Sequence, residues 1–206
     1  GIDVDHFSPQ DSSQLRRDLH LENKRVIVSV GRLVHRKGQD HLIQSMPEIL
    51  KSVPDAHILM VGQGPYLSHL KKLVEELNLV DHVSFIGRIQ YAQLPQYICA
   101  GDIFAMPSRS RFFGLEVEGL GIVYLEASAC GLPVIAGSSG GAPDAVLEGV
   151  TGIVVDGENN NEIAAAAIKL LNDLNGAKAM GLAGREWIIE NWRWQIWSER
   201  FNKLLQ

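Results

Sequence analysis

Two glutamates, Glu118 and Glu126, bracket a glycine-containing turn and an apolar run in the stretch EGLGIVYLE. They lie eight positions apart, about two helical turns, so both carboxylates would lie near the rim of one helix face. There they could accept hydrogen bonds from the hydroxyls of a sugar or a ribose. Each also has a simpler explanation when taken alone. Glu118 fits an acid favoured at a helix start, and Glu126 fits an exposed helical side chain.

Glycines at positions 119 and 121 would let the backbone approach a ligand closely before a helix begins at Ile122. The amides at such a helix start are unpaired, and their aligned dipoles attract phosphate. The stretch therefore fits a ligand that carries both phosphate and hydroxyl groups.

A second group of charged residues lies in GRLVHRKG, residues 31–38, directly after an apolar run. Arg32 and Lys37 would emerge at the carboxyl end of that strand. A guanidinium fork and a mobile ammonium group form a good clamp for a diphosphate. Taken alone, the loop is more simply a solvated basic loop. The joint occurrence of this loop, the two glutamates and the two glycines is hard to explain by chance.

Other phosphate-binding and metal-binding patterns are weak. The segment GQGP, residues 62–65, lacks the third glycine of a dinucleotide fingerprint because Leu67 stands there, and no Walker-type loop occurs. The seven histidines form no cluster of metal-ligand spacing with carboxylates. The sequence therefore does not favour an enzyme that uses a nicotinamide cofactor or ATP.

Composition narrows the class of protein further. With 46% hydrophobic and 21% charged residues among 206, the chain is typical of a globular domain. Its net charge of −5 argues against nucleic-acid binding. Cys99 and Cys130 lie in apolar, helix-like contexts, which favours a reducing compartment. We find neither a signal peptide nor an apolar stretch long enough to span a bilayer.

Apolar, β-branched runs alternate with helix-length segments, which predicts an α/β protein. The expected strands are residues 26–31, 58–62, 83–87, 103–107, 133–136 and 153–155, and the expected helices are 40–52 with a kink at Pro47, 65–78, 94–100, 123–130, 163–174 and 177–190. This alternation favours a Rossmann-like parallel sheet with helices on both faces. Ligands of such sheets bind beyond the carboxyl ends of the strands.

We divide the chain into an entry or linker segment (1–24), a ligand-binding Rossmann-like domain (25–190) and an aromatic C-terminal helix (191–206). In that helix an apolar stripe recurs at helical spacing: Trp194, Trp197, Phe201 and Leu204. The stripe fits partly the core of this domain and partly a contact with a second domain, and we expect the helix to pack toward a missing N-terminal domain. The opening residues are typical of the middle of a protein, so we expect a fragment.

The chain resembles the carboxyl-terminal, donor-binding half of a retaining glycosyltransferase of family 4, with the two-domain GT-B fold. The resemblance covers almost the whole chain. It rests on the order and spacing of these segments: Gly31-Arg32, Lys37-Gly38, the pair Glu118 and Glu126, residues 129–136 (ACGLPVIA), residues 139–144 (SGGAPD), and Gly149 with Thr151-Gly152.

The resemblance implies roles for individual residues. Arg32 and Lys37 would hold the donor diphosphate, and Glu118 would bind the transferred sugar; these three would be catalytic. Glu126 would bind the nucleotide ribose. The remaining donor-binding positions would be Gly87, Arg88 and Ile89 beside the base, Gly119, Leu120 and Gly121 beside the sugar, and the amides near Gly121 and Ile122 at the phosphate. Members of this family need no metal or other cofactor.

One departure from many relatives points to a subgroup. Residues 108–117 form a longer segment than usual, and Leu120 replaces a phenylalanine. That version is similar to bacterial phosphatidylinositol mannosyltransferases, which use GDP-mannose and a lipid acceptor. The resemblance implies a cytoplasmic enzyme of glycolipid or cell-envelope synthesis. Its lipid or glycan acceptor, and any peripheral contact with the inner face of the membrane, would belong to a missing N-terminal half.

Alternatives remain at this point. In one mechanism the glycosidic C–O bond breaks while negative charge accumulates on the leaving diphosphate. In the other, Glu118 acts as a nucleophile in a covalent double displacement. A glycosidase would also use two carboxylates, but it needs no diphosphate clamp. A nucleotide-sugar epimerase or hydrolase on the same scaffold, or a non-catalytic binding module, would share the site. We expect the 206 residues alone to be inactive in transfer.

Overall fold

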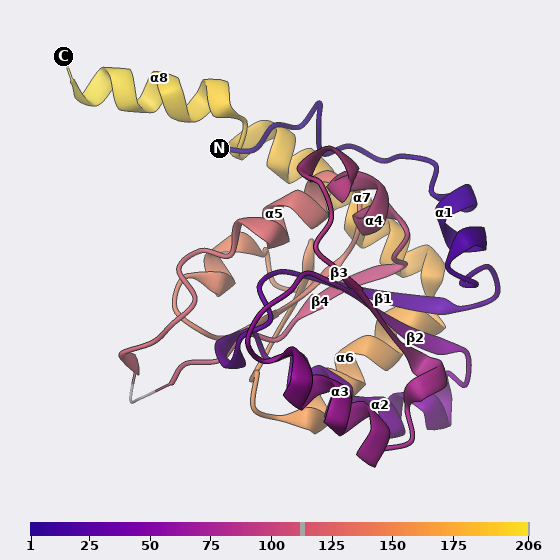
Figure 1. Ribbon diagram of the computed structural model, residues 1–206. Helices are drawn as coiled ribbons and strands as arrows, with labels where there is room; N and C mark the ends of the chain where they lie inside the picture. Colours follow the sequence, from indigo (N-terminus) through magenta and orange to yellow (C-terminus); the bar gives the residue numbers. More distant parts are fainter. Residues whose placement is uncertain (112–113, 206) are drawn as a thin grey trace.

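The computed structural model describes residues 1–111 and 114–205, and its centre is a parallel sheet (Figure 1). The strand order is β3-β2-β1-β4-β5-β6, and every neighbouring pair is parallel. The strands are β1 (Arg25–Val30), β2 (Ala56–Val61), β3 (Val83–Gly87), β4 (Ile103–Met106), β5 (Val134–Gly137) and β6 (Gly152–Val155). The order reverses between β1 and β4, so the loops after these two strands diverge and leave a crevice at that edge.

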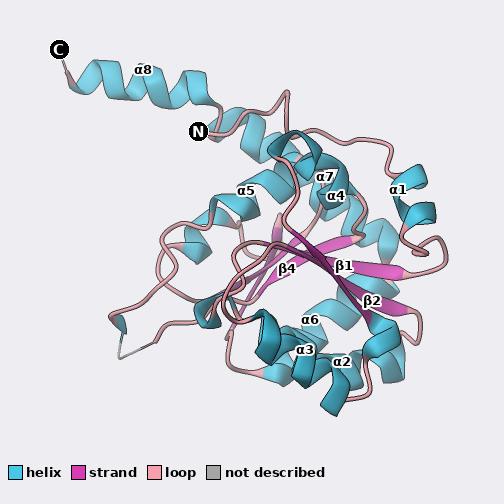
Figure 2. Cartoon of the chain, viewed as in Figure 1, coloured by secondary structure: helices cyan, strands magenta, loops and turns pink. Residues whose placement is uncertain are grey.

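Helices cover both faces of the sheet, as Figure 2 shows. They are α1 (Ser13–Asp18), α2 (Gln39–Ser52), α3 (Leu67–Glu76), α4 (Leu94–Cys99), α5 (Ile122–Ala129), α6 (Asn160–Asn172), α7 (Leu174–Asn191) and α8 (Trp194–Leu204), with short 3-10 turns η1 (His35–Lys37), η2 (Val80–His82), η3 (Tyr91–Gln93) and η5 (Ala142–Ala145). The predicted Rossmann-like fold is therefore confirmed.

Two hydrophobic cores follow from the two-residue period of the strands. On β1, Ile27 packs with α2, α3 and α6, whereas Val26 and Val28 pack with α4 and α5 on the other face. All three side chains are fully buried. Such continuous apolar strands are expected where both faces of a parallel sheet are covered.

The predicted helices lie within a few residues of the observed ones. Helix α2 spans Gln39–Ser52 with Pro47 inside it, and Leu42, Met46 and Ile49 bury one of its faces against the sheet. Burial of that face outweighs the missing backbone hydrogen bond. Helix α3 begins at Leu67 and not at Pro65, because the amide of Tyr66 donates to the carbonyl of Leu33, 3.1 Å away, and holds this segment as a turn.

The N-terminal segment, residues 1–24, packs on the second core, which lies on the α4 and α5 face of the sheet. Ile2, Val4, Phe7 and Leu21 are buried there. It also contains α1, a helix of six residues that the sequence patterns did not predict. From α1, Arg16 donates to the carbonyls of Leu21 and Lys24 and pairs with Asp102 at 3.2 Å.

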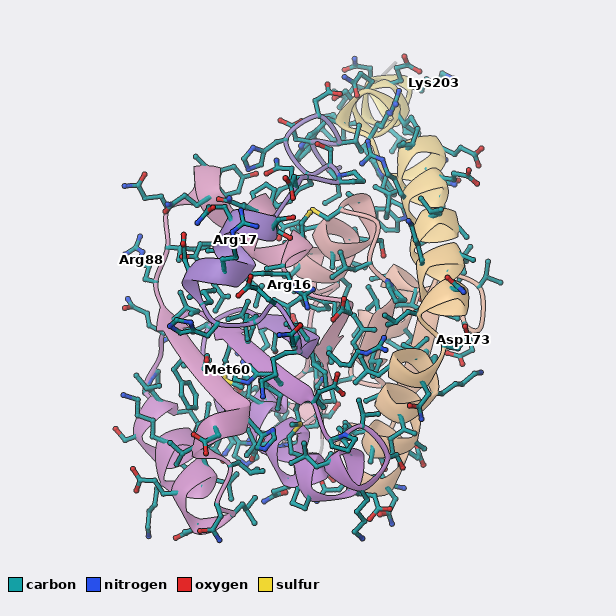
Figure 3. The ribbon with its side chains drawn as sticks, turned by 90° about the vertical axis from the view of Figure 1, so that its right-hand side faces the viewer. Arg16, Arg17, Met60, Arg88, Asp173 and Lys203 are labelled. Carbon is teal, nitrogen blue, oxygen red and sulfur yellow. The ribbon has the colours of Figure 1, made fainter. Side chains whose placement is uncertain are left out.

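Helix α8 projects away from the sheet (Figure 1), and none of its residues is buried. Trp194, Phe201 and Leu204 are 57%, 61% and 84% exposed. Figure 3 shows Lys203 on this helix, at the far end of the molecule from the sheet. The expectation that the stripe belongs to the core of this domain is therefore wrong. Within the described residues, no helix is both long and apolar enough to cross a membrane.

Candidate functional site

The loop after β1 lies directly against the loop after β4. Gly38 adopts a left-handed conformation with φ of 71°, and a Cβ at this position would overlap the carbonyl oxygen of Pro107. The amide of Arg109 donates to the carbonyl of Arg36 at 2.8 Å. A glycine is required where two backbones approach this closely. These contacts hold η1, and with it Lys37, over the carboxyl end of β4.

Lys37 and Glu118 meet at this junction. The Nζ atom of Lys37 lies 2.7 Å from Oε2 of Glu118, and the side chains are 11% and 7% exposed. Arg36 adds a second cation, with its Nε 3.9 Å from the same oxygen. A carboxylate this deeply buried requires such partners, because an uncompensated charge would be expensive there. The β1 loop and the Glu118 segment therefore meet at one edge of the sheet, and their convergence on a ligand stays a prediction.

The loop after β5 supports the backbone around Glu118. Ser139 is fully buried, and its hydroxyl accepts a hydrogen bond from the amide of Glu118 at 3.1 Å. The amide of Gly141 donates to the carbonyl of Gly119 at 2.8 Å. At Gly140, a Cβ would overlap the Glu118 carbonyl oxygen. The SGG sequence at 139–141 thus fixes the Glu118 backbone.

Arg32 differs from Lys37 in having no partner. It is exposed, and within residues 1–111 and 114–205 its guanidinium forms no hydrogen bond or ion pair. It lies two residues after the end of β1, on the same loop as Lys37. Five N–H donors are therefore available at the edge of the sheet where Lys37 and Glu118 lie.

The start of α5 is open. Gly121, at the N-cap, has φ of 72°, and among the described residues no side chain caps the helix. A Cβ on Gly119 would meet no described atom within 4 Å, so the described part of the chain leaves space before the helix. The helix is held in place by Tyr124, whose hydroxyl donates to the Met106 carbonyl at 2.7 Å. Leu120 is partly buried against the second core. This helix start follows the Glu118 segment, on which Lys37 and Arg36 converge, and an open helix start in such surroundings suits an anion.

Glu126 lies just over one turn into α5, four residues after Ile122, and is partly buried. Burial raises the pKa of its carboxyl to about 7. The expectation of an exposed helical glutamate is therefore wrong. Burial, and after it the charge of Glu126, raises the pKa of the Tyr91 phenol. Tyr91 lies four residues after β3. Because the charge of Glu126 affects the Tyr91 phenol, the Glu126 carboxylate lies near the loop that follows β3.

Residues 87–89 comprise the last residue of β3 and the start of the loop that follows it. Gly87 has φ of 80°, and a Cβ added to it would meet no described atom within 4 Å. Ile89 is partly buried and packs against the second core. Figure 3 shows Arg88 extending outward at the edge of the sheet. The turn therefore offers main-chain groups and the outward-pointing cation of Arg88 at the same edge as the other predicted residues.

A buried ion pair that the sequence patterns missed lies behind the β1 loop. Arg109 binds Asp40 through two hydrogen bonds of 2.8 and 2.6 Å, and their side chains are 3% and 8% exposed. The Tyr66 hydroxyl donates to the same carboxylate at 2.8 Å. Burial opposes ionisation of Asp40, yet the Arg109 and Tyr66 hydrogen bonds and the Arg109 charge together lower its pKa. The one available signal was an acid in the first turn of a predicted helix.

Asp40 also explains which helix start is open to a ligand. It occupies the first turn of α2, the helix that follows β1. Its carboxylate already supplies the negative charge that a helix dipole favours there, and the Pro107 carbonyl closes off Gly38. The start of α5, which lacks both features, is therefore the accessible one.

A second set of ion pairs involves the longer segment 108–117. Glu116 contacts Arg36 at 3.4 Å and Arg111 at 3.1 Å, and all three side chains are about one-third exposed. Phe112 and Phe113 of this segment lie outside the described residues. Among the residues that are described, no group of three or more His, Cys, Asp and Glu side chains is placed to hold a metal ion.

The strand order and the loops that meet beyond β1, β4 and β5 define half of a GT-B glycosyltransferase fold. The chain belongs to the family described as glycosyl transferases group 1, whose model matches residues 11–187. The resemblance stated from the sequence is thereby confirmed.

Two curated relatives match the whole chain. It is 48% identical over 207 residues to a GDP-mannose-dependent alpha-(1-6)-phosphatidylinositol monomannoside mannosyltransferase of Mycolicibacterium smegmatis, covering 54% of that protein. It is 46% identical over 210 residues to the corresponding enzyme for the monoacylated acceptor of Corynebacterium glutamicum, again covering 54%. The chain therefore spans about half the length of these relatives.

Solved structures agree with this assignment. Anabaena HepE in complex with UDP is 25% identical and superposes with a TM-score of 0.89, over all of this chain and 55% of that one. The C-terminal domain of a glycosyl transferase group 1 protein of Francisella tularensis, at 24% identity, superposes with a TM-score of 0.81 over 95% of this chain and all of that domain. The latter likeness shows a shared fold.

Proposed function

We propose that these residues form the donor-binding half of a retaining hexosyltransferase, which transfers mannose from GDP-mannose to a lipid or glycan acceptor in glycolipid or cell-envelope synthesis. The observation that carries this proposal is the ion pair of Lys37 with Glu118 at 2.7 Å, directly before the open start of α5. The names of the 46–48% identical relatives support mannose and GDP as the sugar and the nucleotide.

In this proposal the diphosphate binds between the β1 loop and α5. Arg32, which is exposed and has no guanidinium partner among the described residues, would grip it with two parallel hydrogen bonds, and Lys37 would act as a point charge. The amides near Gly121 and Ile122 would complete the site from the helix start. Binding would draw Lys37 partly from Glu118 toward the phosphate.

The flanking carboxylates would hold the two sugar rings. Glu118, with the backbone of residues 119–121, would accept hydrogen bonds from hydroxyls of the transferred sugar. Glu126 would accept from the nucleotide ribose, and the turn at residues 87–89 would lie against the base. Open space beside Gly119 and Gly87 supports these placements.

The chemistry follows from the charges. As the glycosidic C–O bond breaks, negative charge collects on the leaving diphosphate, and Arg32, Lys37 and the α5 dipole would stabilise it. The buried Glu118 carboxylate faces Lys37 and would favour positive charge on the sugar. A glycosyl ester on Glu118, detected by mass spectrometry of quenched enzyme, would replace this mechanism with a double displacement.

We infer that the acceptor binds to a part of the full-length protein outside these residues, in a second domain that closes over the donor. The exposed stripe on α8 supports a contact with that domain. On this basis the 206 residues alone would bind nucleotide but transfer no sugar. We assign the full-length protein to the cytoplasm, with any contact at the inner face of the membrane made by the other half.

Melting-temperature shifts of this domain with GDP, UDP and ADP test the donor proposal, since a ligand that binds the folded state raises the transition. GDP should give the largest shift, and calorimetry should show weaker GDP binding in Arg32→Ala and Glu126→Ala. Unchanged affinity in both variants would refute the site. A preference for UDP, the nucleotide in the Anabaena complex, would reassign the donor.

Transfer itself requires the full-length protein. Labelled GDP-mannose should be consumed only when an acceptor is supplied. Turnover of the donor without an acceptor would instead identify an epimerase or a hydrolase.

A further inference from the structure

Arg109 is the most deeply buried charged side chain near the site, and it contacts no proposed ligand position. Its guanidinium is fixed on one side by the two-point ion pair with Asp40, in the first turn of α2. A buried pair of this kind adds little net stability compared with an apolar substitute. The Asp40–Arg109 pair therefore contributes mainly by holding neighbouring groups in place.

The other side of the guanidinium faces the β1 loop. Its Nε donates to Nδ1 of His35 at 3.2 Å, and its Nη2 lies 2.9 Å from both ring nitrogens. Donation to Nδ1 requires that this nitrogen carries no proton, so His35 is a neutral ring here. Burial, followed by the charge of Arg109, lowers the pKa of His35 and is consistent with that state.

The backbone of Arg109 grips the same loop at the next residue. Its amide donates to the carbonyl of Arg36 at 2.8 Å. Lys37 follows immediately, and Gly38 is packed against the Pro107 carbonyl. One arginine thus contacts two consecutive residues of η1, and the third residue of that turn is the cation that reaches Glu118.

We propose that Arg109 is a positioning residue: held by Asp40, it fixes His35 and the Arg36 carbonyl and so sets the direction from which Lys37 and Arg32 meet the donor diphosphate. This inference rests on the proposed function of the site. A clamp displaced by about 1 Å can lose on the order of a hundredfold in rate, so a fixed loop matters even though Arg109 never touches the donor.

The test uses His35, because it is only partly buried and its loss leaves the Asp40–Arg109 pair intact. In the full-length protein, His35→Leu removes the acceptor for Arg109, whereas His35→Asn keeps an oxygen near the position of Nδ1. His69→Leu is the matched control, since His69 is exposed and stacks on Tyr66 at 4.5 Å without being hydrogen-bonded to Arg109 in the described structure.

Binding of GDP and of guanosine is measured for each variant, by calorimetry and by ligand-observed NMR. Guanosine lacks the diphosphate, so a positioning role should spare it. We expect His35→Leu to weaken GDP binding about tenfold, with guanosine binding and melting temperature close to wild type. His35→Asn should recover most of the loss, and His69→Leu should match wild type.

The outcomes separate this inference from the proposed function. If wild type binds GDP no better than guanosine, and Lys37→Ala changes nothing, the diphosphate site itself is refuted. If Lys37→Ala weakens GDP binding but His35→Leu does not, only the positioning role of Arg109 is overturned. Equal losses of GDP and guanosine binding, or no recovery in His35→Asn, would also overturn it, because they indicate general disruption of the loop.

Discussion

The ammonium group of Lys37 and the carboxylate of Glu118 form an ion pair, 2.7 Å apart, between two loops that are 81 residues apart in the chain (118 minus 37). Both side chains are almost fully buried. The pair therefore differs from surface ion pairs, in which water screens most of the attraction. It holds the β1 and β4 loops together before any ligand binds.

Removing either partner should destabilise the domain. Lys37→Met or Glu118→Gln leaves the other residue as a buried charge with a weaker partner, at a cost of about 3–5 kcal/mol. The double variant should cost clearly less than the sum. Urea unfolding of the four proteins measures this coupling. Lys72–Glu76, a pair 3.4 Å apart with side chains 74% and 57% exposed, is the control, with an expected coupling below about 1 kcal/mol. Equal coupling in both pairs would contradict the buried assignment.

Glu126 should make GDP binding depend on pH near neutrality. Burial raises its pKa to about 7, so the carboxyl is largely neutral at pH 6 and ionised at pH 8. Ribose hydroxyls donate better to the ionised form, so GDP affinity should rise from pH 6 to 8 by up to about tenfold. Phosphate also titrates near pH 6. The pH dependence of GDP affinity that remains in Glu126→Gln reports the phosphate contribution. If the pH dependence in Glu126→Gln equals that of wild type, Glu126 is not its source.

The same shift has a consequence for stability. A carboxyl whose folded pKa is raised stabilises the fold below its ordinary value of 4.5 and loses that contribution as pH rises through about 7. Glu126→Gln should therefore stabilise the ligand-free domain at pH 8, by about 1 kcal/mol after allowance for solvent screening. At pH 5 it should have little effect. Thermal unfolding at the two pH values checks this.

The sequence predicted the sheet and the place of the site because both depend on local patterns. Apolar runs that end in glycine mark β1 and β2, and ligands of parallel sheets bind at the carboxyl ends of strands. That rule places Lys37 and Glu118 at one edge of the sheet, and the structure shows them in contact there. It needed no knowledge of side-chain contacts.

What the sequence did not predict depends on tertiary contacts. Asp40 and Arg109 are 69 positions apart, and only the pairing of β1 beside β4 brings them together. The burial of Glu126 depends on how α5 packs, which helical spacing alone does not determine.

Gly38 should tolerate substitution far less than Gly149. The two have nearly equal φ of 71° and 73°, so alanine costs similar backbone strain at both. Only at Gly38 would a Cβ overlap a carbonyl oxygen, that of Pro107, whereas Gly149 has nothing within 4 Å. Gly38→Ala should lose roughly 1–3 kcal/mol more than Gly149→Ala. Equal losses in chemical unfolding would mean that the β1 loop does not lie against Pro107.

The aromatic stripe on α8 should make the 206-residue chain self-associate. Trp194, Trp197 and Phe201 are 57%, 36% and 61% exposed, which is costly in water. Replacing all three with serine should weaken self-association at least tenfold, as measured by analytical ultracentrifugation. In the full-length protein the same change should lower the melting temperature. Triple substitution of the exposed residues Val80, Leu182 and Val150 is the control, and it should change neither quantity.

His57 should make the domain sensitive to acid. It lies on β2, 6% exposed, with Nε2 2.9 Å from the Ser84 hydroxyl and Nδ1 without a hydrogen-bond partner in the described structure. Burial, followed by the charge of Lys24, lowers its pKa from 6.5 to about 4. The unfolded chain therefore takes up this proton first as the pH falls.

The sign and size of the effect follow from that difference. A histidine whose folded pKa is lowered contributes its stability fully above pH 6.5 and loses it as the pH falls toward 4. The loss should be about 3 kcal/mol over this range. His57→Leu gives up the bond to Ser84, but its unfolding free energy should fall less steeply with acid. Urea unfolding from pH 7 to 4 measures the slope, with the exposed His69→Leu as control. A slope in His57→Leu equal to that of wild type would assign the acid sensitivity to other groups.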